Sequence, residues 1–238
     1  HSFIPTQIKV AKKLKKIVVP SESSGKDVVK DFSLKDESIE VVHNGIDLGF
    51  FYPSDKPYED YKILSIASSD VPMKGLDFMI KAFPEIKKNY PKAKLSVLGK
   101  IREEGHTERL INSLDLKDDI NFVSGLSHSE LREQYCSSHV VVIPSLYEGF
   151  GFAAAEAMAC GVPALVSDGG SLKEIVGEAG KVIIPGDENA IVDAVNELFS
   201  CEDLRKNMVA KGIFRVKDKF TWHNAALKLD NIYHQVIE

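Results

Sequence analysis

Residues 144–163 have the sequence PSLYEGFGFAAAEAMACGVP, and this stretch decides the fold class. An apolar run typical of a buried strand ends at Pro144, a Gly-Phe-Gly turn covers residues 149–151, and a helix is predicted to begin near Phe152. The free backbone N–H groups and the dipole of such a helix attract an anion. Glycine on both sides of Phe150 lets a ligand come close to the backbone. The stretch therefore predicts an anion-binding turn between a strand and a helix.

Two glutamates flank this turn. Glu148 stands at its mouth, and Glu156 is the only charged residue between Phe152 and Cys160. Because the neighbours of Glu156 are alanine, methionine and cysteine, the helix is expected to be buried, and a buried carboxylate needs hydrogen-bond partners. Ligand hydroxyls would serve, so a functional role is favoured for Glu156. A solvated helix residue is the alternative for Glu156, and an ordinary loop residue is the alternative for Glu148.

Outward from this segment, short apolar runs alternate with helical patterns. The expected strands are Ile17–Val19, Ile39–Val42, Ile63–Ala67, Leu95–Leu98, Ile120–Val123, Val140–Ile143, Ala164–Val166 and Val182–Ile184. The expected helices cover Leu76–Ile86, Glu104–Asp115, Ser127–Cys136, Ala153–Ala159 and Asp187–Phe199, with Pro84 kinking or interrupting the first. Nearly all-apolar strands that alternate with helices are typical of an α/β fold, a doubly wound parallel sheet with helices on both faces.

The two ends of the chain have a different character. Residues 1–50 contain a basic helical pattern from Ile8 to Lys16, two short strands and a turn. Residues 51–61 are rich in proline and charge and are predicted to form a linker. The last residues, from Phe220 to Glu238, form a separate amphipathic helical pattern.

Composition excludes several classes of protein. A net charge of −5 over 238 residues gives no overall electrostatic attraction to nucleic acid. The three cysteines (Cys136, Cys160, Cys201) are widely spaced, so they predict neither a disulfide framework nor a zinc site and fit a reducing compartment. No apolar run is long enough to span a bilayer. The expected location is cytoplasmic; the basic face of Lys12, Lys13, Lys15 and Lys16 is expected to be solvated, with peripheral membrane contact as the alternative.

Two further segments resemble ligand loops. Ser68–Gly75 follows the expected strand Ile63–Ala67, and its Lys74 falls just before a helix, where the dipole disfavours a cation unless an anion is also present. An exposed lysine is the alternative. In Ser167–Glu174, the residues Ser171 and Glu174 have the spacing of a capping box. Walker-type, HExxH and GxSxG motifs are absent, and the histidines lack metal-ligand spacing.

With these motifs in order, the chain resembles the family 4 retaining glycosyltransferases (glycosyl transferases group 1), which have the two-domain GT-B fold. Glu148 and Glu156 match that family's Glu-x7-Glu motif, together with the Gly-Phe-Gly turn and the following EAMACGVP. Other landmarks that resemble the family are VHNGID at 42–47, MKGL at 73–76, FVSG at 122–125, GSLKEIV at 170–176 and FTW at 220–222.

The resemblance implies roles for individual residues. Lys74 would contact the donor diphosphate and act in catalysis with Glu148, which would hold the sugar with the backbone of residues 149–152. Glu156 would bind the ribose hydroxyls, and Leu126 would lie near the base. Ser68 and Ser69 stand where the family usually has an arginine, so another group is needed to neutralise phosphate. The expected donor-binding set is Ser68, Ser69, Lys74, Leu126, Glu148, Gly149, Phe150, Gly151, Phe152 and Glu156.

The resemblance also implies a domain organisation. Residues 1–50 would be the tail of an N-terminal acceptor domain, 51–61 the interdomain linker, 62–218 a Rossmann-like nucleotide-sugar-binding domain, and 219–238 a helix that crosses towards the N-terminal domain. The remainder of the acceptor half is missing, so the fragment alone is expected to be inactive. Apolar surface around Ile17, Val18, Trp222 and Leu227 is expected to be exposed.

The implied reaction transfers a sugar from a nucleotide diphosphate sugar to an acceptor hydroxyl with retention, without a metal or another cofactor. UDP, GDP and ADP types stay open for the donor, and glycan, lipid-linked and small-molecule acceptors stay open too. A GT-B-fold nucleotide-sugar epimerase or sugar phosphorylase is the alternative of the same fold. A catalytically inactive nucleotide-binding scaffold is the alternative of another class.

Overall fold

The computed structural model of the chain describes residues 4–67 and 70–237. Ser68 and Ser69, which the sequence places in the donor site, lie outside the described residues. Within the described part, the strands are β1 (Ile17–Val19), β2 (Ile39–Val41), β3 (Lys62–Ile66), β4 (Lys94–Leu98), β5 (Ile120–Val123), β6 (Val140–Ile143), β7 (Ala164–Ser167) and β8 (Lys181–Ile183). The α-helices are α1 (Ile4–Ala11), α2 (Glu22–Phe32), α3 (Leu76–Asn89), α4 (His106–Ser113), α5 (His128–Cys136), α6 (Phe152–Ala159), α7 (Leu172–Val176), α8 (Glu188–Ser200), α9 (Glu202–Lys219) and α10 (Trp222–Ile237).

Six strands form one parallel sheet with the order β5-β4-β3-β6-β7-β8. The chain builds β3, β4 and β5 towards one edge, then returns to place β6 beside β3 and continues to the other edge. The order therefore reverses between β3 and β6, and the loops that leave these two strands diverge there. Such a switch point is where open α/β sheets bind ligands, outside the carboxyl ends of the strands. The doubly wound parallel sheet expected from the sequence is confirmed.

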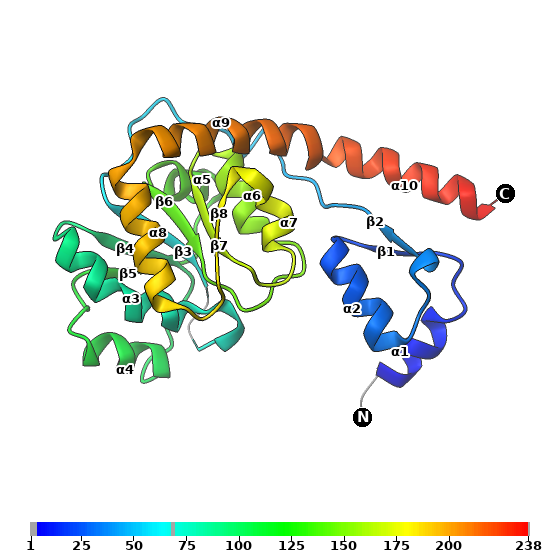
Figure 1. Cartoon of the computed structure of the whole chain (residues 1–238), viewed down its shortest axis with the longest axis horizontal. Coiled ribbons are helices and arrows are strands. Elements are labelled where there is room, and N and C mark those ends of the chain that lie inside the picture. The colour runs from blue at the N-terminus through cyan, green and yellow to red at the C-terminus, as the bar shows by residue number, and fades with distance from the viewer. Residues whose placement is uncertain (1–3, 68–69, 238) are drawn as a thin grey trace.

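The alternation of side chains along each strand divides the core between two faces of this sheet. In β6, Val140 and Val142 pack with α3 and α8, whereas Val141 and Ile143 pack with α6 and α7. Successive residues of a strand point to opposite faces, so an all-apolar strand needs helices on both sides. Figure 1 shows these layers, with α3 and α8 on one side of the sheet and α6, α7 and α9 on the other.

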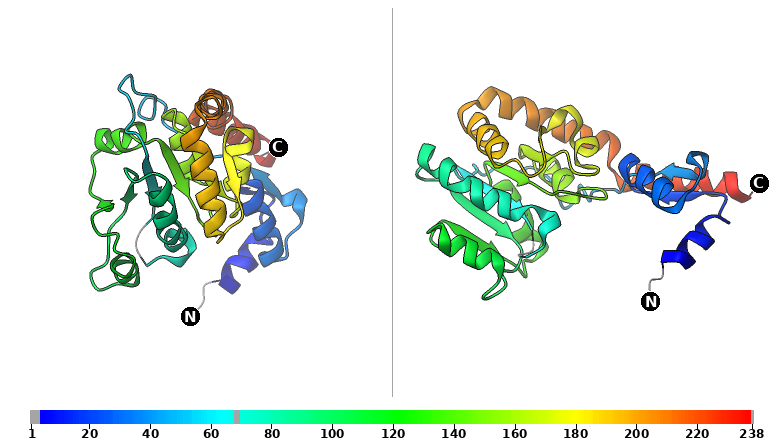
Figure 2. Two further views of the ribbon diagram at one scale, coloured as in Figure 1. Left: turned by 60° about the vertical axis from the view of Figure 1, so that its left-hand side comes forward. Right: turned by 60° about the horizontal axis from the view of Figure 1, so that its bottom comes forward.

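A second, small unit contains α1, α2, β1 and β2. Its two strands pair in parallel, and Figures 1 and 2 show it beside the large sheet, with α10 leading from the end of α9 to it. The chain enters this junction at residues 45–46: Ile46 N–H donates to the carbonyl of Phe220 at 2.8 Å, and a Cβ on Gly45 would collide with the backbone of Trp222. Beyond the junction, Val42 packs with Ala225 and Ile232 of α10.

Several local expectations differ from the structure. α3 continues through Pro84 to Asn89, because Met79, Ile80, Phe83 and Ile86 on its buried face are all inaccessible to solvent and hold the helix on the sheet. The basic pattern from Ile8 to Lys16 ends earlier, since α1 stops at Ala11. The helices α2 and α9 were not predicted from the sequence.

The exposed apolar surface expected at the small unit and the closing helix is present in part. Val18 is 43% exposed, Trp222 56% and Leu227 52%, whereas Ile17 is half-buried. Among residues 4–67 and 70–237, no helix has the length and apolarity needed to cross a membrane.

Amide exchange should separate the two units. We expect the amides of Ile17–Val19 to exchange at least about ten-fold faster than those of Val140–Ile143, because β1 belongs to a two-stranded sheet with few buried apolar contacts. Hydrogen–deuterium exchange followed by mass spectrometry measures both peptides in one sample. Equal protection of the two strands would contradict this ranking and show that the small unit is as stable as the large sheet.

Candidate functional site

The loops that follow β3 and β6 meet at the switch point of the sheet. Lys74 comes from the first loop and Glu148 from the second, and Lys74 Nζ lies 2.7 Å from Glu148 Oε1. Ser145 Oγ donates to the same carboxylate oxygen at 2.9 Å. The side chain of Lys74 is 38% exposed and that of Glu148 is 19% exposed, so the pair is accessible from solvent. Two residues 74 positions apart therefore form one polar group at the carboxyl ends of the strands.

Close backbone contacts bring these two loops together. Gly75 has a left-handed backbone with φ of 66°, and a Cβ there would overlap the carbonyl oxygen of Pro144. Leu146 N–H donates to the carbonyl of Met73 at 2.8 Å. Only glycine permits the backbone to pass this closely in that conformation. The MKGL segment thus fixes Lys74 against the loop that carries Glu148.

The loop after β7 holds the backbone of Glu148 from the other side. Ser171 donates to the carbonyl oxygen of Glu148 through its N–H at 2.9 Å and through Oγ at 3.0 Å. The capping box expected for Ser171 and Glu174 is wrong. Ser171 makes no side-chain cap hydrogen bond, and the carboxylate of Glu174 accepts from the backbone N–H of Glu22 in the small unit. Gly170, with φ of 66°, lies so close to Glu148 that a Cβ would overlap its carbonyl.

The N-terminus of α6 has no side chain to cap it. Its N-cap is Gly151, with φ of 91°, and no side-chain cap hydrogen bond is made there. The first-turn N–H groups of a helix need partners from outside the helix. Phe152 at the first helical position is 45% exposed, whereas Phe150 is buried and in ring contact with it at 5.0 Å. This end of α6 can therefore accept a ligand anion.

Glu156 lies one turn further along α6, and its partner is a tyrosine. Tyr135 Oη donates to Glu156 Oε2 at 2.6 Å, and Tyr135 is almost inaccessible to solvent. Burial raises the pKa of Glu156, while the hydrogen bond from Tyr135 lowers it. The burial expected from the sequence is observed, but the hydrogen-bond partner is a protein hydroxyl from α5. Tyr135 was not predicted as a site residue, because no motif in the sequence marks it.

The remaining predicted residues are distributed around the same edge. Leu126 is half-buried in the loop after β5, two strands from β3, and stays a prediction as a base contact. Gly149 has a contact that the sequence did not suggest: Ser21 Oγ and Ser24 Oγ donate to its carbonyl oxygen at 2.7 and 2.8 Å. Both serines belong to the N-terminal end of α2, so the small unit directly contacts the loop between β6 and α6.

Glu174 provides a second link to the small unit. Its carboxylate accepts from the backbone N–H groups of Glu22 and Ser23 at 3.1 and 3.3 Å, and His43 Nε2 lies 2.7 Å from Oε1. A carboxylate at a helix N-terminus is stabilised by the helix dipole. Tyr147 Oη adds a hydrogen bond to Asp27 at 2.6 Å. The contact between the two units is therefore largely polar.

Comparisons with known proteins show a family and a fold that this chain shares. The family described as Glycosyl transferases group 1 matches residues 52–214. The chain is 31% identical over 240 residues to the MMP alpha-(1->4)-mannosyltransferase of Mycolicibacterium hassiacum, covering 100% of this chain and 58% of that protein. Sucrose-phosphate synthase from Thermosynechococcus elongatus superposes with a TM-score of 0.85 at 26% identity, over 98% of this chain and 61% of the other. Anabaena HepE, solved in complex with UDP-glucose, superposes with a TM-score of 0.84 at 15% identity, over 97% and 67%. The chain thus spans about three fifths of the length of its curated relative.

Replacing Gly75 by alanine should damage the junction of the two loops. Gly75→Ala adds a methyl group that overlaps the carbonyl of Pro144, whereas Gly125→Ala, also at positive φ, adds one into open space. We expect Gly125→Ala to lower the free energy of unfolding by about 1 kcal/mol, the cost of the left-handed backbone, and Gly75→Ala to lower it by about 2–4 kcal/mol. Urea unfolding of both variants measures the difference. Equal losses would mean that the close approach to Pro144 contributes nothing.

Proposed function

The chain belongs to the glycosyl transferases group 1 family, and from that premise we propose that it is the donor-binding part of a retaining glycosyltransferase. The donor is a nucleotide diphosphate sugar, and the acceptor is a hydroxyl group. The observation that carries this proposal is the Lys74–Glu148 pair, placed at the switch point beside the uncapped N-terminus of α6. A cation and free N–H groups at one edge of a sheet suit a diphosphate, and a carboxylate beside them suits sugar hydroxyls.

The proposed reaction breaks the bond between the anomeric carbon and the diphosphate oxygen, and the electron pair leaves with the diphosphate. Lys74 and the N–H groups at the start of α6 stabilise the charge that develops on the leaving group. The acceptor oxygen bonds to the anomeric carbon from the same face, and its proton passes to a phosphate oxygen. Since the chain supplies these positive groups itself, the proposal includes no metal ion and no cofactor.

The pairing seen between Lys74 and Glu148 fits this scheme. In the structure each side chain neutralises the other, and Ser145 also holds the carboxylate. A diphosphate would compete for Lys74, and the sugar would offer hydroxyl donors to Glu148. If only one ligand group bound, Lys74 or Glu148 would lose its partner. The diphosphate and the sugar of one donor would therefore bind together, so that each charged side chain keeps a partner.

Glu156 is proposed to bind the ribose. Its carboxylate has one oxygen bonded to Tyr135, which leaves further lone pairs for two neighbouring hydroxyls. The role of Tyr135 is then to hold the carboxylate in position. Ser68, Ser69 and Leu126 are proposed donor contacts on the resemblance alone.

The acceptor side is proposed to come from chain beyond these 238 residues. The mannosyltransferase relative has more than a third of its length outside the matched part. The exposed Val18, Trp222 and Leu227 lie on the unit and helix that adjoin the large sheet, and such surface suits packing against a further domain. The nucleotide-sugar type of donor gains support from HepE, which shares the fold and has been solved with UDP-glucose.

Replacing the two glutamates should have different effects on donor binding. Glu156→Ala should weaken nucleoside diphosphate binding by about 1.5–3 kcal/mol, the range for a hydrogen bond to a charged group. Glu148→Ala should spare the nucleoside diphosphate and weaken only its sugar conjugate, because that carboxylate faces the sugar. Isothermal titration of each variant with the diphosphate and the sugar conjugate measures both effects. Equal losses for both ligands in both variants would show that the two roles are wrongly assigned.

Thermal shift with UDP, GDP, ADP and their sugars should identify the base. We expect one nucleotide family to raise the melting temperature and Lys74→Met to abolish most of that rise, because the diphosphate loses its cation. Lys100→Met, which removes a lysine from the loop after β4, is the comparison. The absence of a shift with every nucleotide would contradict donor binding by this chain.

A further inference from the structure

A cavity lies at the amino ends of the strands of the large sheet, at the opposite end of the strands from the Lys74–Glu148 pair. Its volume is about 360 Å³, within the range of small-molecule sites. His139 and Pro163, which line it, immediately precede β6 and β7, and Tyr58 precedes β3, so the cavity is at the amino ends of the strands. Strands of four residues separate it from the Lys74–Glu148 edge by roughly 13 Å. The cavity is therefore separate from the candidate donor site.

One wall of the cavity carries a buried hydrogen-bond donor without a partner. His139 is 4% exposed, and its Nδ1 accepts from Tyr61 N–H at 3.0 Å. Because Nδ1 is the acceptor, the neutral ring carries its proton on Nε2, and this buried nitrogen has no hydrogen-bond partner in the described part of the chain. Burial, followed by the charge of Arg205, lowers the pKa of His139 to about 4. A buried donor of this kind is costly unless an acceptor occupies the space before it.

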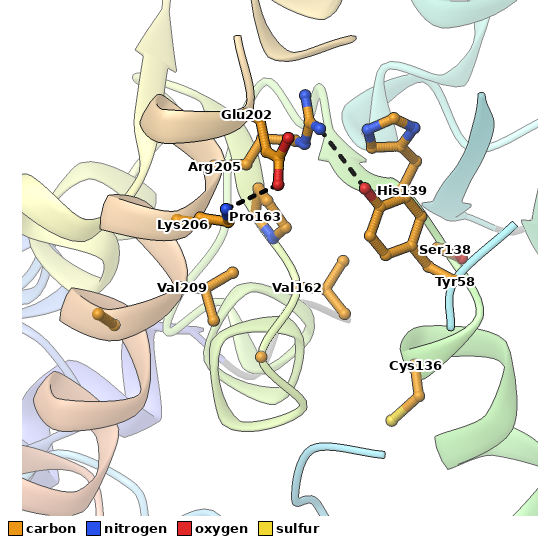
Figure 3. Close-up of a pocket in the computed structure, with 12 residues that line it drawn as sticks. Tyr58, Cys136, Ser138, His139, Val162, Pro163, Glu202, Arg205, Lys206 and Val209 are labelled. Carbon is orange, nitrogen blue, oxygen red and sulfur yellow. Dashed lines mark hydrogen bonds and ion pairs between the residues drawn. The ribbon is translucent and has the colours of Figure 1, made fainter. Parts of the chain in front are cut away.

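Arg205 brings a positive charge to the same wall. Its guanidinium donates to the carbonyls of Leu198 and Phe199 and, at 3.4 Å, to the hydroxyl of Tyr58. Figure 3 shows this contact as a dashed line, with the ring of His139 beside the guanidinium and one ring nitrogen directed towards it. Lys206 on the next position of α9 is 2.7 Å from Glu202 and is thus already neutralised. Among the described residues, the bonded partners of Arg205 are uncharged oxygens.

Most of the remaining lining is apolar, and the hydroxyl of Ser138, which also lines the cavity, is bonded to the carbonyl of Gln134. Val162, Pro163 and Val209 face the cavity from two sides, and the ring of Tyr58 closes it (Figure 3). Water gains nothing from these apolar walls. An occupant that matches the whole lining has an acceptor with negative charge at one end and a hydrophobic body at the other.

We propose that this cavity is a binding site for a small organic anion, a carboxylate or phosphate that carries a single apolar ring or a chain of similar size. The anionic group is attracted by Arg205, whose guanidinium lies beside the ring of His139. The apolar body lies against Val162, Pro163 and Val209. The site belongs to the same chain as the donor site but binds independently of it.

Benzoate and phenyl phosphate are the probes, and inorganic phosphate and benzyl alcohol supply one half of the chemistry each. In calorimetric titrations, we expect at least one of the two probes to bind with Kd of about 1 mM or tighter, and neither half-probe to do so. Arg205→Gln should weaken the probe at least about ten-fold, whereas Lys211→Gln, a charge removed elsewhere on α9, should leave it unchanged. Failure of both probes would overturn the proposal and leave the cavity to water.

A second measurement does not depend on altering the charged wall. Cys136 lines the cavity, and a hydrogen bond with Cys160, together with the charge of Arg132, lowers the pKa of its thiol to about 7. In a Cys201→Ser background, the binding probe should slow alkylation of Cys136 by iodoacetamide at least about three-fold at saturation, because an occupant covers the thiol. Unchanged alkylation in the presence of a bound probe would place that probe elsewhere. Absence of binding of UDP, GDP and ADP with intact probe protection would contradict the donor site alone, so the two proposals fail separately.

Discussion

The approach of the Gly75 backbone to the carbonyl of Pro144 is the constraint on which the candidate site depends. The loops after β3 and β6 leave the sheet at its switch point, where the chain turns in opposite directions on the two sides. Side chains larger than hydrogen at position 75 would hold these loops apart. Because the backbones touch, a lysine and a glutamate 74 residues apart can bond at 2.7 Å. A second close contact, between Gly170 and the carbonyl of Glu148, holds the same loop from the side of β7. The charged pair is therefore positioned by backbone packing and needs no long side-chain scaffold.

Helix α6 runs from the carboxyl ends of the strands towards their amino ends. It begins after the turn of residues 149–151, carries Glu156 in its second turn, and ends at Ala159, with Cys160 as its C-cap. Tyr135 and Cys136, adjacent at the end of α5, contact it at two points: Tyr135 bonds Glu156, and Cys136 lies near the carbonyl of Cys160. Between these two points, Ala154, Ala155, Ala157 and Met158 pack the helix tightly between the sheet and α9.

The sequence predicted the fold well where physical signals were local. All-apolar runs identified every strand of the large sheet to within a residue or two, because burial on both faces leaves no other pattern. The helices α2 and α9 were missed because their faces are mostly polar: Gly25 is the one buried residue within α2, and α9 buries three of its eighteen residues. In the site, Glu148 and Glu156 followed from a motif, but the partners Ser171 and Tyr135 come from other segments, 23 and 21 residues away from the glutamates that they contact. Such contacts depend on tertiary packing, and no spacing along the chain encodes them.

Hydrogen bonds between the two units join the loop between β6 and α6 to the N-terminal end of α2. Ser21 and Ser24 at the start of α2 bond the carbonyl of Gly149, and Glu174 bonds the N–H groups of the same helix end. Hydrogen bonds of this kind can be exchanged for water at small net cost, unlike buried apolar area, so the contact resembles those between domains that move. Gly149 is also the residue that begins the turn into α6. A shift of α2 therefore changes the hydrogen bonding of the turn of residues 149–151 at the candidate site, through the carbonyl group of Gly149.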